Sequence, residues 1–181
     1  MRRLTLIAVL LFLVSPTLLS AFEPDTGDEM QLAVAKAILD VKKADPGMEK
    51  FFDGAAGYAV FPTVGKGGLV VGGAHGKGLV IVGDKAIGKT SLSQATVGLQ
   101  MGGQKYSQFI FFRDKTAVGH FKRGNFEFGA QASAVAITAG ASADAAYDSG
   151  VAIFTHAAGG LMFEGSVGGQ RFKYTPKETA A

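Results

Sequence analysis

Eight residues near the middle of the chain match the pattern of a nucleotide-binding phosphate loop. The stretch GDKAIGKT begins at Gly83 and ends at Thr90, and it fits G-x-x-x-x-G-K-[ST] letter for letter. In such a loop the backbone amides and the lysine surround the phosphates of a nucleotide. The loop must open a helix, because the N-terminal amides and the dipole of that helix hold the phosphates. The flanking residues therefore decide whether the motif can work.

The flanking sequence predicts strands on both sides of this motif. An apolar run at 78–82 precedes it, and QATVGLQM at 94–101 follows it. The second segment alternates apolar and polar residues with the period of a half-buried strand. We therefore interpret residues 83–90 as a glycine-rich turn between antiparallel strands, with Lys85 and Lys89 in solvent. The match to the phosphate loop is coincidental on this interpretation, and we expect no nucleotide binding.

The other residue types that could do chemistry are scattered along the chain. His75, His120 and His156 are far apart, without a carboxylate at ligand spacing, and there is no cysteine. Thiolate metal sites and cysteine nucleophiles are thereby excluded. No G-x-S-x-G nucleophile elbow occurs either. We predict no enzymatic activity, no metal and no cofactor, with a hydrolase of dispersed catalytic residues as an open alternative.

Lysines beside glycines are the residues best suited to bind a ligand. They flank a predicted glycine-rich hairpin, and such turns expose backbone amides that form anion-binding concavities. A lysine adds a point charge, so we predict a phospholipid headgroup as the ligand. Ordinary solvated lysines in turns are the alternative. The predicted site consists of Lys66, Gly67, Gly68, His75 and Lys77, with Lys42 and Lys43 adding positive charge nearby.

One helix and then many strands must position these residues. Residues 28–45 carry apolar side chains at three-and-four spacing, which is typical of an amphipathic helix. We expect this helix to pack on the domain, with insertion into a membrane as the alternative. Beyond residue 57, period-two runs predict a strand that Pro62 ends and a hairpin that turns at 74–77. A further alternating strand is predicted in NFEFGAQASAVAI, from residue 125.

The order of the predicted elements indicates an α+β fold. Asp114 is a suitable N-cap for a short helix between two strands, and helices do not otherwise alternate with strands. We predict a mainly antiparallel sheet or barrel-like core, with an N-terminal helix and one short helix between strands. The predicted segments are a helical segment at 22–56, a β-rich domain at 57–176 and a flexible tail at 177–181.

The first residues, MRRLTLIAVLLFLVSPTLLSA, have the anatomy of a secretory signal peptide. We predict cleavage after Ala21, with an uncleaved anchor as the alternative, although the apolar run is short of the ~20 residues that a spanning helix needs. Loss of Arg2 and Arg3 lowers the net charge from +3 to +1, so charge does not argue for nucleic acid. We expect an exported protein of the periplasm or cell envelope, without a lipoprotein cysteine.

Several stretches resemble the SYLF-domain family, also described as lipid-binding or actin-regulator domains. They are GYAVFPTVGKGGLVVGGAHGKGLVIV (57–82), ATVGLQMGGQKYSQFIFF (95–112), GNFEFGAQASAVA (124–136) and GLMFEGSVGGQRFKYTP (160–176). The resemblance implies a membrane-associated module. Eukaryotic relatives bind phosphoinositides and, with partner domains, regulate actin, whereas exported bacterial relatives, which this sequence resembles more, are described as lipid-binding envelope proteins. It supplies no catalytic residues, and without SH3 or FYVE partner domains we do not expect actin binding.

We therefore expect a non-enzymatic module that binds lipid or phospholipid at a membrane surface of the bacterial envelope. A small outer-membrane β-barrel is one alternative, because a signal peptide and alternating strands suit it. A soluble structural protein of the envelope is the other. We predict no nucleic acid and no nucleotide as partner, and the sequence makes no prediction of the oligomeric state.

Overall fold

A curled antiparallel sheet forms the body of the protein. The computed structural model describes residues 22–68, 71–97, 103–124, 126–129, 132–157 and 167–177; the predicted signal peptide and most of the predicted tail lie outside them. The sheet has eight strands in the order β5-β8-β3-β2-β1-β4-β7-β6. The strands are β1 (Gly57–Gly68), β2 (Val71–Val82), β3 (Lys85–Val97), β4 (Gln104–Phe112), β5 (Phe126–Glu127), β6 (Val135–Ala136), β7 (Val151–Ala157) and β8 (Arg171–Pro176).

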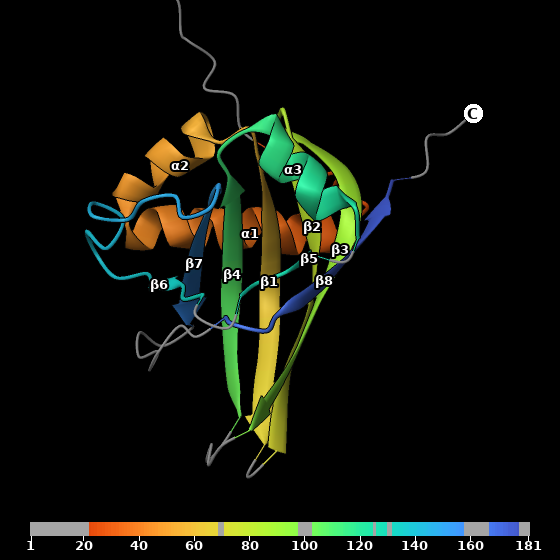
Figure 1. The fold of residues 1–181 in the computed structure, drawn as a ribbon. Coiled ribbons are helices and arrows are strands. Elements are labelled where there is room, and N and C mark those ends of the chain that lie inside the picture. Colours follow the sequence, from red (N-terminus) through yellow and green to blue (C-terminus); the bar gives the residue numbers. More distant parts are fainter. Residues whose placement is uncertain are drawn as a thin grey trace, which may run out of the picture.

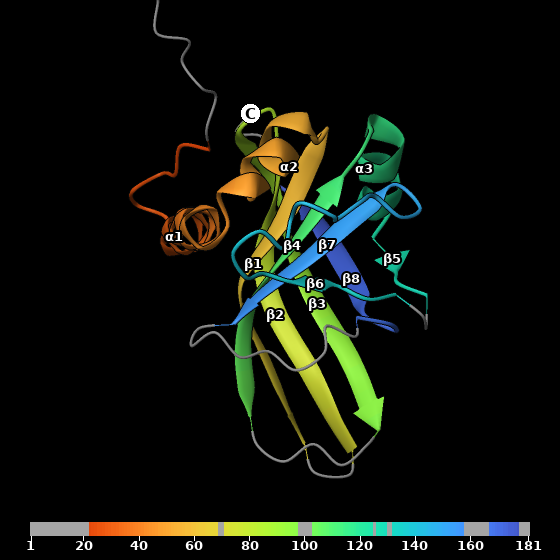
Figure 2. The ribbon, with the colours of Figure 1, turned by 90° about the vertical axis from the view of Figure 1, so that its left-hand side faces the viewer.

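Helices lie on both faces of this sheet. Figure 2 shows α1 and α2 on one side and α3 on the other. The helices are α1 (Glu29–Ala44), the 3-10 turn η1 (Pro46–Met48), α2 (Glu49–Gly54) and α3 (Lys115–Lys122). All strand pairs are antiparallel except β6 with β7. The predicted α+β fold is confirmed as a half-barrel with an N-terminal helix and a short helix between strands (Figure 1).

The helix α1 packs on the sheet, as predicted, and it begins directly after a capping aspartate. The Asp28 carboxylate accepts hydrogen bonds from the backbone N–H groups of Met30 (2.9 Å) and Gln31 (3.1 Å). These N–H groups have no partner within the helix, so the cap stabilises its first turn. The buried stripe includes Val34 and Val41, both fully buried. α1 therefore packs through its apolar stripe.

Two apolar cores lie on the two faces of the sheet. The core under α1 and α2 joins Val34 and Val41 to alternate residues of the strands, among them Leu79 and Phe109. The core on the α3 side takes the intervening strand residues, together with α3. Side chains alternate between faces along a strand. A strand residue that belongs to one of these cores therefore shows which face its neighbours occupy: residues two positions away lie on the same face, and adjacent residues lie on the opposite face.

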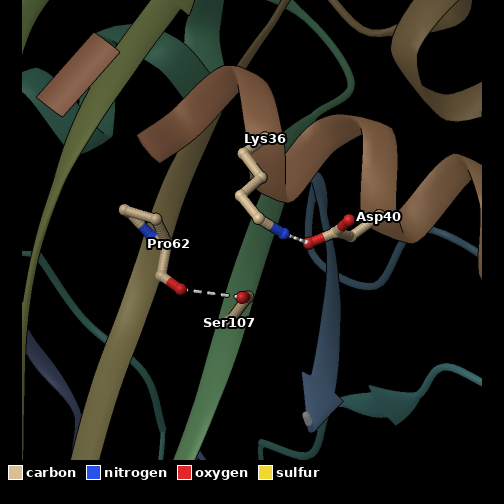
Figure 3. Close-up of polar contacts among 4 residues, drawn as sticks. All are labelled: Lys36, Asp40, Pro62 and Ser107. Carbon is tan, nitrogen blue, oxygen red and sulfur yellow. Dashed lines mark hydrogen bonds and ion pairs between the residues drawn. The ribbon is translucent and has the colours of Figure 1, made fainter. Parts of the chain in front are cut away.

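The prediction that Pro62 ends a strand is wrong. β1 continues through Pro62 to Gly68, and its pairing with both neighbours shifts near this residue. Proline lacks the N–H of a ladder hydrogen bond, so inside a sheet it is accommodated at a bulge. The Pro62 carbonyl accepts a hydrogen bond from the Ser107 hydroxyl of β4 at 2.8 Å (Figure 3).

The predicted turn at 74–77 is also wrong, because β2 runs without interruption from Val71 to Val82. Its glycines sit where a neighbouring backbone approaches closely. A Cβ at Gly78 would lie 2.1 Å from the carbonyl oxygen of Val60, and a Cβ at Gly76 would lie 3.1 Å from that of Thr63. These glycines therefore permit close strand packing rather than a turn.

The alternating stretch after residue 125 does not form one strand. Its described part contains β5 and β6, of two residues each, which lie at opposite edges of the sheet. The chain crosses from one edge to the other between them. The alternating apolar residues Phe126, Phe128, Ala132 and Ala134 are therefore explained by packing in the α3-side core and not by one continuous strand.

Candidate functional site

The stretch that resembles a phosphate loop forms a tight hairpin. Gly83 and Asp84 connect β2 to β3 with φ of +55° and +59°, the left-handed values that favour a two-residue hairpin turn. Lys85 to Thr90 then belong to β3. A turn between antiparallel strands is present as predicted, but it comprises only Gly83 and Asp84 and not the whole of residues 83–90. Lys85 and Lys89 are exposed. Because no helix follows the turn, the motif lacks the amides and dipole that a phosphate loop uses.

The structure disperses the residues of the predicted site. Lys42 lies near the end of α1, where its Nζ contacts Glu49 Oε1 at 2.9 Å and sits 4.8 Å from the ring centroid of Phe52. These contacts join α1 to α2 within the fold. Lys43, beside it, is exposed.

The two lysines predicted to flank one hairpin lie on opposite faces of the sheet. Lys66 pairs with Ala74, which belongs to the α3-side core. Lys77 and His75 precede Leu79 by two and four residues, and Leu79 belongs to the α1-side core. Gly67 and Gly68 pair with Gly73 and Gly72 within the β1–β2 ladder. The predicted cluster is therefore split, and its glycines lie in strands.

The long strands carry basic residues and no acidic ones. Within the bounds given above, β1 to β4, β7 and β8 contain no Asp or Glu. Their only neighbour with a carboxylate in the sheet is β5, where Glu127 pairs with Arg171 at 3.0 Å. The described acids otherwise lie on helices, turns and loops. The sheet therefore has a positive surface, although the net charge of the whole chain is only +3.

Most of these bases project from one face, which we call the basic face. Lys89 pairs with Leu79 of the α1-side core, Lys105 lies four residues before Phe109 of that core, and Lys173 follows Phe172 of the opposite core. Alternation places all three on the α1 side. All members of this face are exposed. The basic face consists of His75 and Lys77 of β2, Lys89 of β3, Lys105 of β4, and Arg171 and Lys173 of β8.

Sequence reasoning missed four of these residues: Lys89, Lys105, Arg171 and Lys173. The signal was present as period-two patterns such as KTSLSQ and RFKYT, in which bases and hydroxyl residues share one side. However, the alternation does not reveal which strands are neighbours. Only the pairing of β8 with β3 brings residues 171–173 beside residues 91–93.

A pocket of about 390 Å³ lies on the basic face beside the N-terminal end of α1. Ser91 is in the middle of its floor: it pairs with Lys77 on one side and with Lys173 on the other. Lys89 precedes Ser91 by two residues and therefore lies on the same face of β3. Its lining residues are Met30, Lys77, Gly78, Lys89, Thr90, Ser91, Lys173 and Thr175.

A second pocket, of about 430 Å³, shares Lys89 and Thr175 with the first and extends toward the cap of α1. Asp28 and Gln31 line it. The side-chain hydrogen bond from Gln31, aided by its backbone N–H and more weakly by Lys89, holds the pKa of Asp28 below its ordinary value. A carboxylate therefore stays ionised in the second pocket at neutral pH beside Lys89 and Lys177, whereas the lining of the first pocket contains three lysines and no carboxylate.

In the described ranges, no three His, Asp or Glu side chains gather closely enough to hold a metal ion. His75 is on the basic face, His120 is on α3 and His156 is on β7. Among the described residues, no helix combines the length and apolar character needed to cross a bilayer.

Comparison with known proteins finds similarity to one family and to one curated relative. Residues 93–181 match the family model Ysc84, described as "Las17-binding protein actin regulator". Beta cell expansion factor A of Aeromonas veronii is 28% identical over 156 residues, which cover 82% of this chain and 59% of that relative. The chain thus spans less than two thirds of the relative's length. Residues 93–181 are thus similar to the Ysc84 family, the SYLF-domain family that the sequence resembles.

Proposed function

We propose that the protein is a non-enzymatic module that binds anionic phospholipid surfaces of the bacterial cell envelope through its basic face. The observation that carries this proposal is the placement of Lys77, Lys89, Lys105 and Lys173 on one face of strands that contain no acid. Each basic residue near an anionic membrane contributes about 1 kcal/mol. Several together suffice for reversible docking.

The outer side of α1 supports the same orientation on a membrane. Leu32 and Leu39 are 42% and 68% exposed, and Lys43 lies one further turn along this stripe. A helix with leucines and lysines on its outer side is suited to a membrane interface. α1 packs on the face of the sheet that bears the basic residues (Figure 2). The leucines and the basic face therefore point to the same side of the molecule.

The composition of the basic face favours phosphates over nucleic acid. Proteins that bind single strands stack the bases on aromatic rings. Among the described residues, the exposed strand positions around the basic face are Gly, Ala, Ser, Thr, His, Lys and Arg, with Glu127 at its edge and without Phe or Tyr. The similarity of residues 93–181 to the Ysc84 family also supports a lipid ligand, because lipid binding is a general property associated with SYLF domains.

We propose export as the route to this surface. The predicted signal peptide at 1–21 is the observation behind it. Mass spectrometry of the protein from a native envelope fraction should give a chain that starts at Phe22. An intact N-terminus at Met1 in a cytoplasmic fraction would contradict both the export and the proposed compartment.

Vesicle co-sedimentation tests the membrane proposal. The purified protein should sediment with phosphatidylglycerol vesicles at low salt, remain in the supernatant with phosphatidylcholine vesicles, and be released by high salt. Lys105→Glu reverses one charge on the basic face outside the pocket, so binding should weaken by roughly thirtyfold. Lys115→Glu makes the same change on α3, on the other side of the sheet, and should bind as the unchanged protein does. Equal binding of both variants, or no binding at low salt, would refute the proposal.

A further inference from the structure

We infer that the pocket around Ser91 is a discrete binding site for one phosphoryl group, either of a phosphate ester or of inorganic phosphate. The pocket lies within the basic face, so the inference rests on the function proposed above and deepens it. General attraction to a membrane is a property of the whole face. A phosphoryl site instead requires a fixed geometry at one place.

The cross-strand register places three lysines next to Ser91. Lys77 of β2 and Lys173 of β8 are its direct neighbours on either side, and both are exposed on the α1 side. Directly paired residues lie about 5 Å apart across a sheet. Lys89 occupies the next position of the same face along β3. Long lysine side chains can converge over the short Ser91 from three directions.

Small residues keep the space between these lysines open. Gly78 and Ser91 contribute little side chain, and Met30 of α1 and Thr175 of β8 complete the walls of the 390 Å³ pocket. Thr90 already donates its hydroxyl to the Lys173 carbonyl at 2.9 Å, which braces β3 against β8 at this level. The pocket is therefore a hollow in a paired sheet, and its floor is held by the ladder.

The lining selects the chemistry of the ligand. Among the described residues that line this pocket, none is acidic and none is aromatic. Nothing there would stack on a sugar or base. A phosphoryl group offers three strong acceptor oxygens and up to two negative charges, which match three lysines and the hydroxyls of Ser91 and Thr175. A carboxylate offers only two oxygens and one charge, so it fits this set less well.

The neighbouring α1 terminus does not supply the site. The backbone N–H groups of Met30 and Gln31 already donate to Asp28. Asp28 also places a carboxylate in the adjoining pocket, which disfavours a phosphoryl group there. The anion is therefore held by lysines and hydroxyls from three strands.

This assignment gives Lys89 a different role from the one its motif suggests. In a phosphate loop the lysine acts together with the amides of the following helix. Here Lys89 lies in the middle of β3 and approaches the pocket from a strand. Both a phosphate loop and this pocket would bind a phosphoryl group. However, the described residues on either side of the motif form strands, and no helix follows the motif to bind a nucleotide.

The test is an NMR titration of the full, ¹⁵N-labelled protein with sodium phosphate and with glycerol 3-phosphate at constant ionic strength. We expect saturable shifts of the Ser91, Lys77 and Lys173 amides, with about fivefold weaker binding in Lys89→Ala. Ser91→Val fills the hollow without changing charge and should abolish the saturable shifts. Ser93→Val is the control, because Ser93 is the next residue on the same face of β3 and lies outside the pocket lining. Shifts that do not saturate, or that persist in Ser91→Val, would overturn the inference.

Vesicles identify the source of the phosphoryl group and separate this inference from the general proposal. If Ser91→Val weakens binding to phosphatidic acid vesicles but not to phosphatidylglycerol vesicles, the group belongs to a lipid headgroup. If both vesicle types bind as before while the glycerol 3-phosphate shifts are lost, the pocket serves a free ester. If the original protein binds no vesicles but still shows saturable shifts with phosphate, the proposed membrane function is wrong and the phosphoryl site in the pocket is retained.

Discussion

Asp45 and Ser142, 97 residues apart in sequence, form a buried hydrogen bond of 2.7 Å between the Asp45 carboxylate and the Ser142 backbone N–H. The other carboxylate oxygen accepts from the Gly47 N–H at 3.0 Å. Asp45 is 2% exposed. This residue therefore joins the corner between α1 and η1 to the loop that precedes β7.

Replacing Asp45 should weaken the fold in a pH-dependent way. Burial alone would raise the pKa of Asp45, but hydrogen bonds from Ser142 and Gly47 outweigh it and hold the pKa below its ordinary value of 3.8. The stabilisation is therefore present above that value and is lost as the pH falls through the lower, folded-state pKa. We expect Asp45→Asn to lower the free energy of unfolding by about 2 kcal/mol at neutral pH.

Urea unfolding measures this effect. The difference between the unchanged protein and Asp45→Asn should shrink when the pH is lowered from about 7 to about 2, because the carboxylate is then protonated in both states. Asp53→Asn removes an exposed carboxylate of α2 and should change the stability little at either pH. A difference for Asp45→Asn that does not vary with pH would contradict the role given to its charge.

The glycines of the sheet should differ sharply in their tolerance of alanine. A Cβ at Gly78 would meet the Val60 carbonyl at 2.1 Å, whereas a Cβ at Gly65 would meet no atom within 4 Å. We expect Gly78→Ala to lower the free energy of unfolding by at least about 2 kcal/mol. Gly65→Ala should stabilise by about 0.5 kcal/mol, because alanine reduces the freedom of the unfolded chain. Thermal unfolding of the two variants checks this, and similar melting temperatures would contradict the close approach of β1 and β2.

The buried amides of Gln108 and Gln170 should behave as one unit. Each donates to the other, at 2.7 and 3.1 Å, and both are fully buried. Gln108→Leu leaves the Gln170 amide without this partner and should cost about 2 kcal/mol. The double variant Gln108→Leu/Gln170→Leu should regain much of that loss. A double-mutant cycle by urea unfolding measures the coupling, and additive losses would show that the two amides do not depend on each other.

The more exposed of the two outer leucines of α1 offers a prediction for membrane binding without a change of charge. Leu39 is 68% exposed, so Leu39→Gln should leave the unfolding free energy within about 0.5 kcal/mol of the original. The variant should still sediment less with phosphatidylglycerol vesicles, because the apolar contact of Leu39 with the membrane is lost. Ala33→Gln is a suitable control on the same helix, because Ala33 is also exposed but small. Unchanged vesicle binding in Leu39→Gln would show that α1 does not touch the membrane.

Local features of this protein were predictable from the sequence. The cap of α1 at Asp28, the short helix after Asp114 and the hairpin turn at Gly83 depend on residues only a few positions apart. Capping, turn conformation and amphipathic spacing are interactions of neighbours in the chain. Each could therefore be inferred from a short window of residues, and the antiparallel α+β architecture followed from their order.

Tertiary structure decided which residues share a surface. A continuation of β1 through Pro62 depends on a bulge against two partner strands, which no local pattern indicates. Lys66 and Lys77 were expected together, but the register places them on opposite faces, whereas it brings Lys77, Ser91 and Lys173 into one row. The physical reason is that a shift of one residue in strand pairing moves a side chain to the other face. Sequence alone determined the lysines and the antiparallel strands, whereas strand order and register determined that Lys77 and Lys173 lie on either side of Ser91.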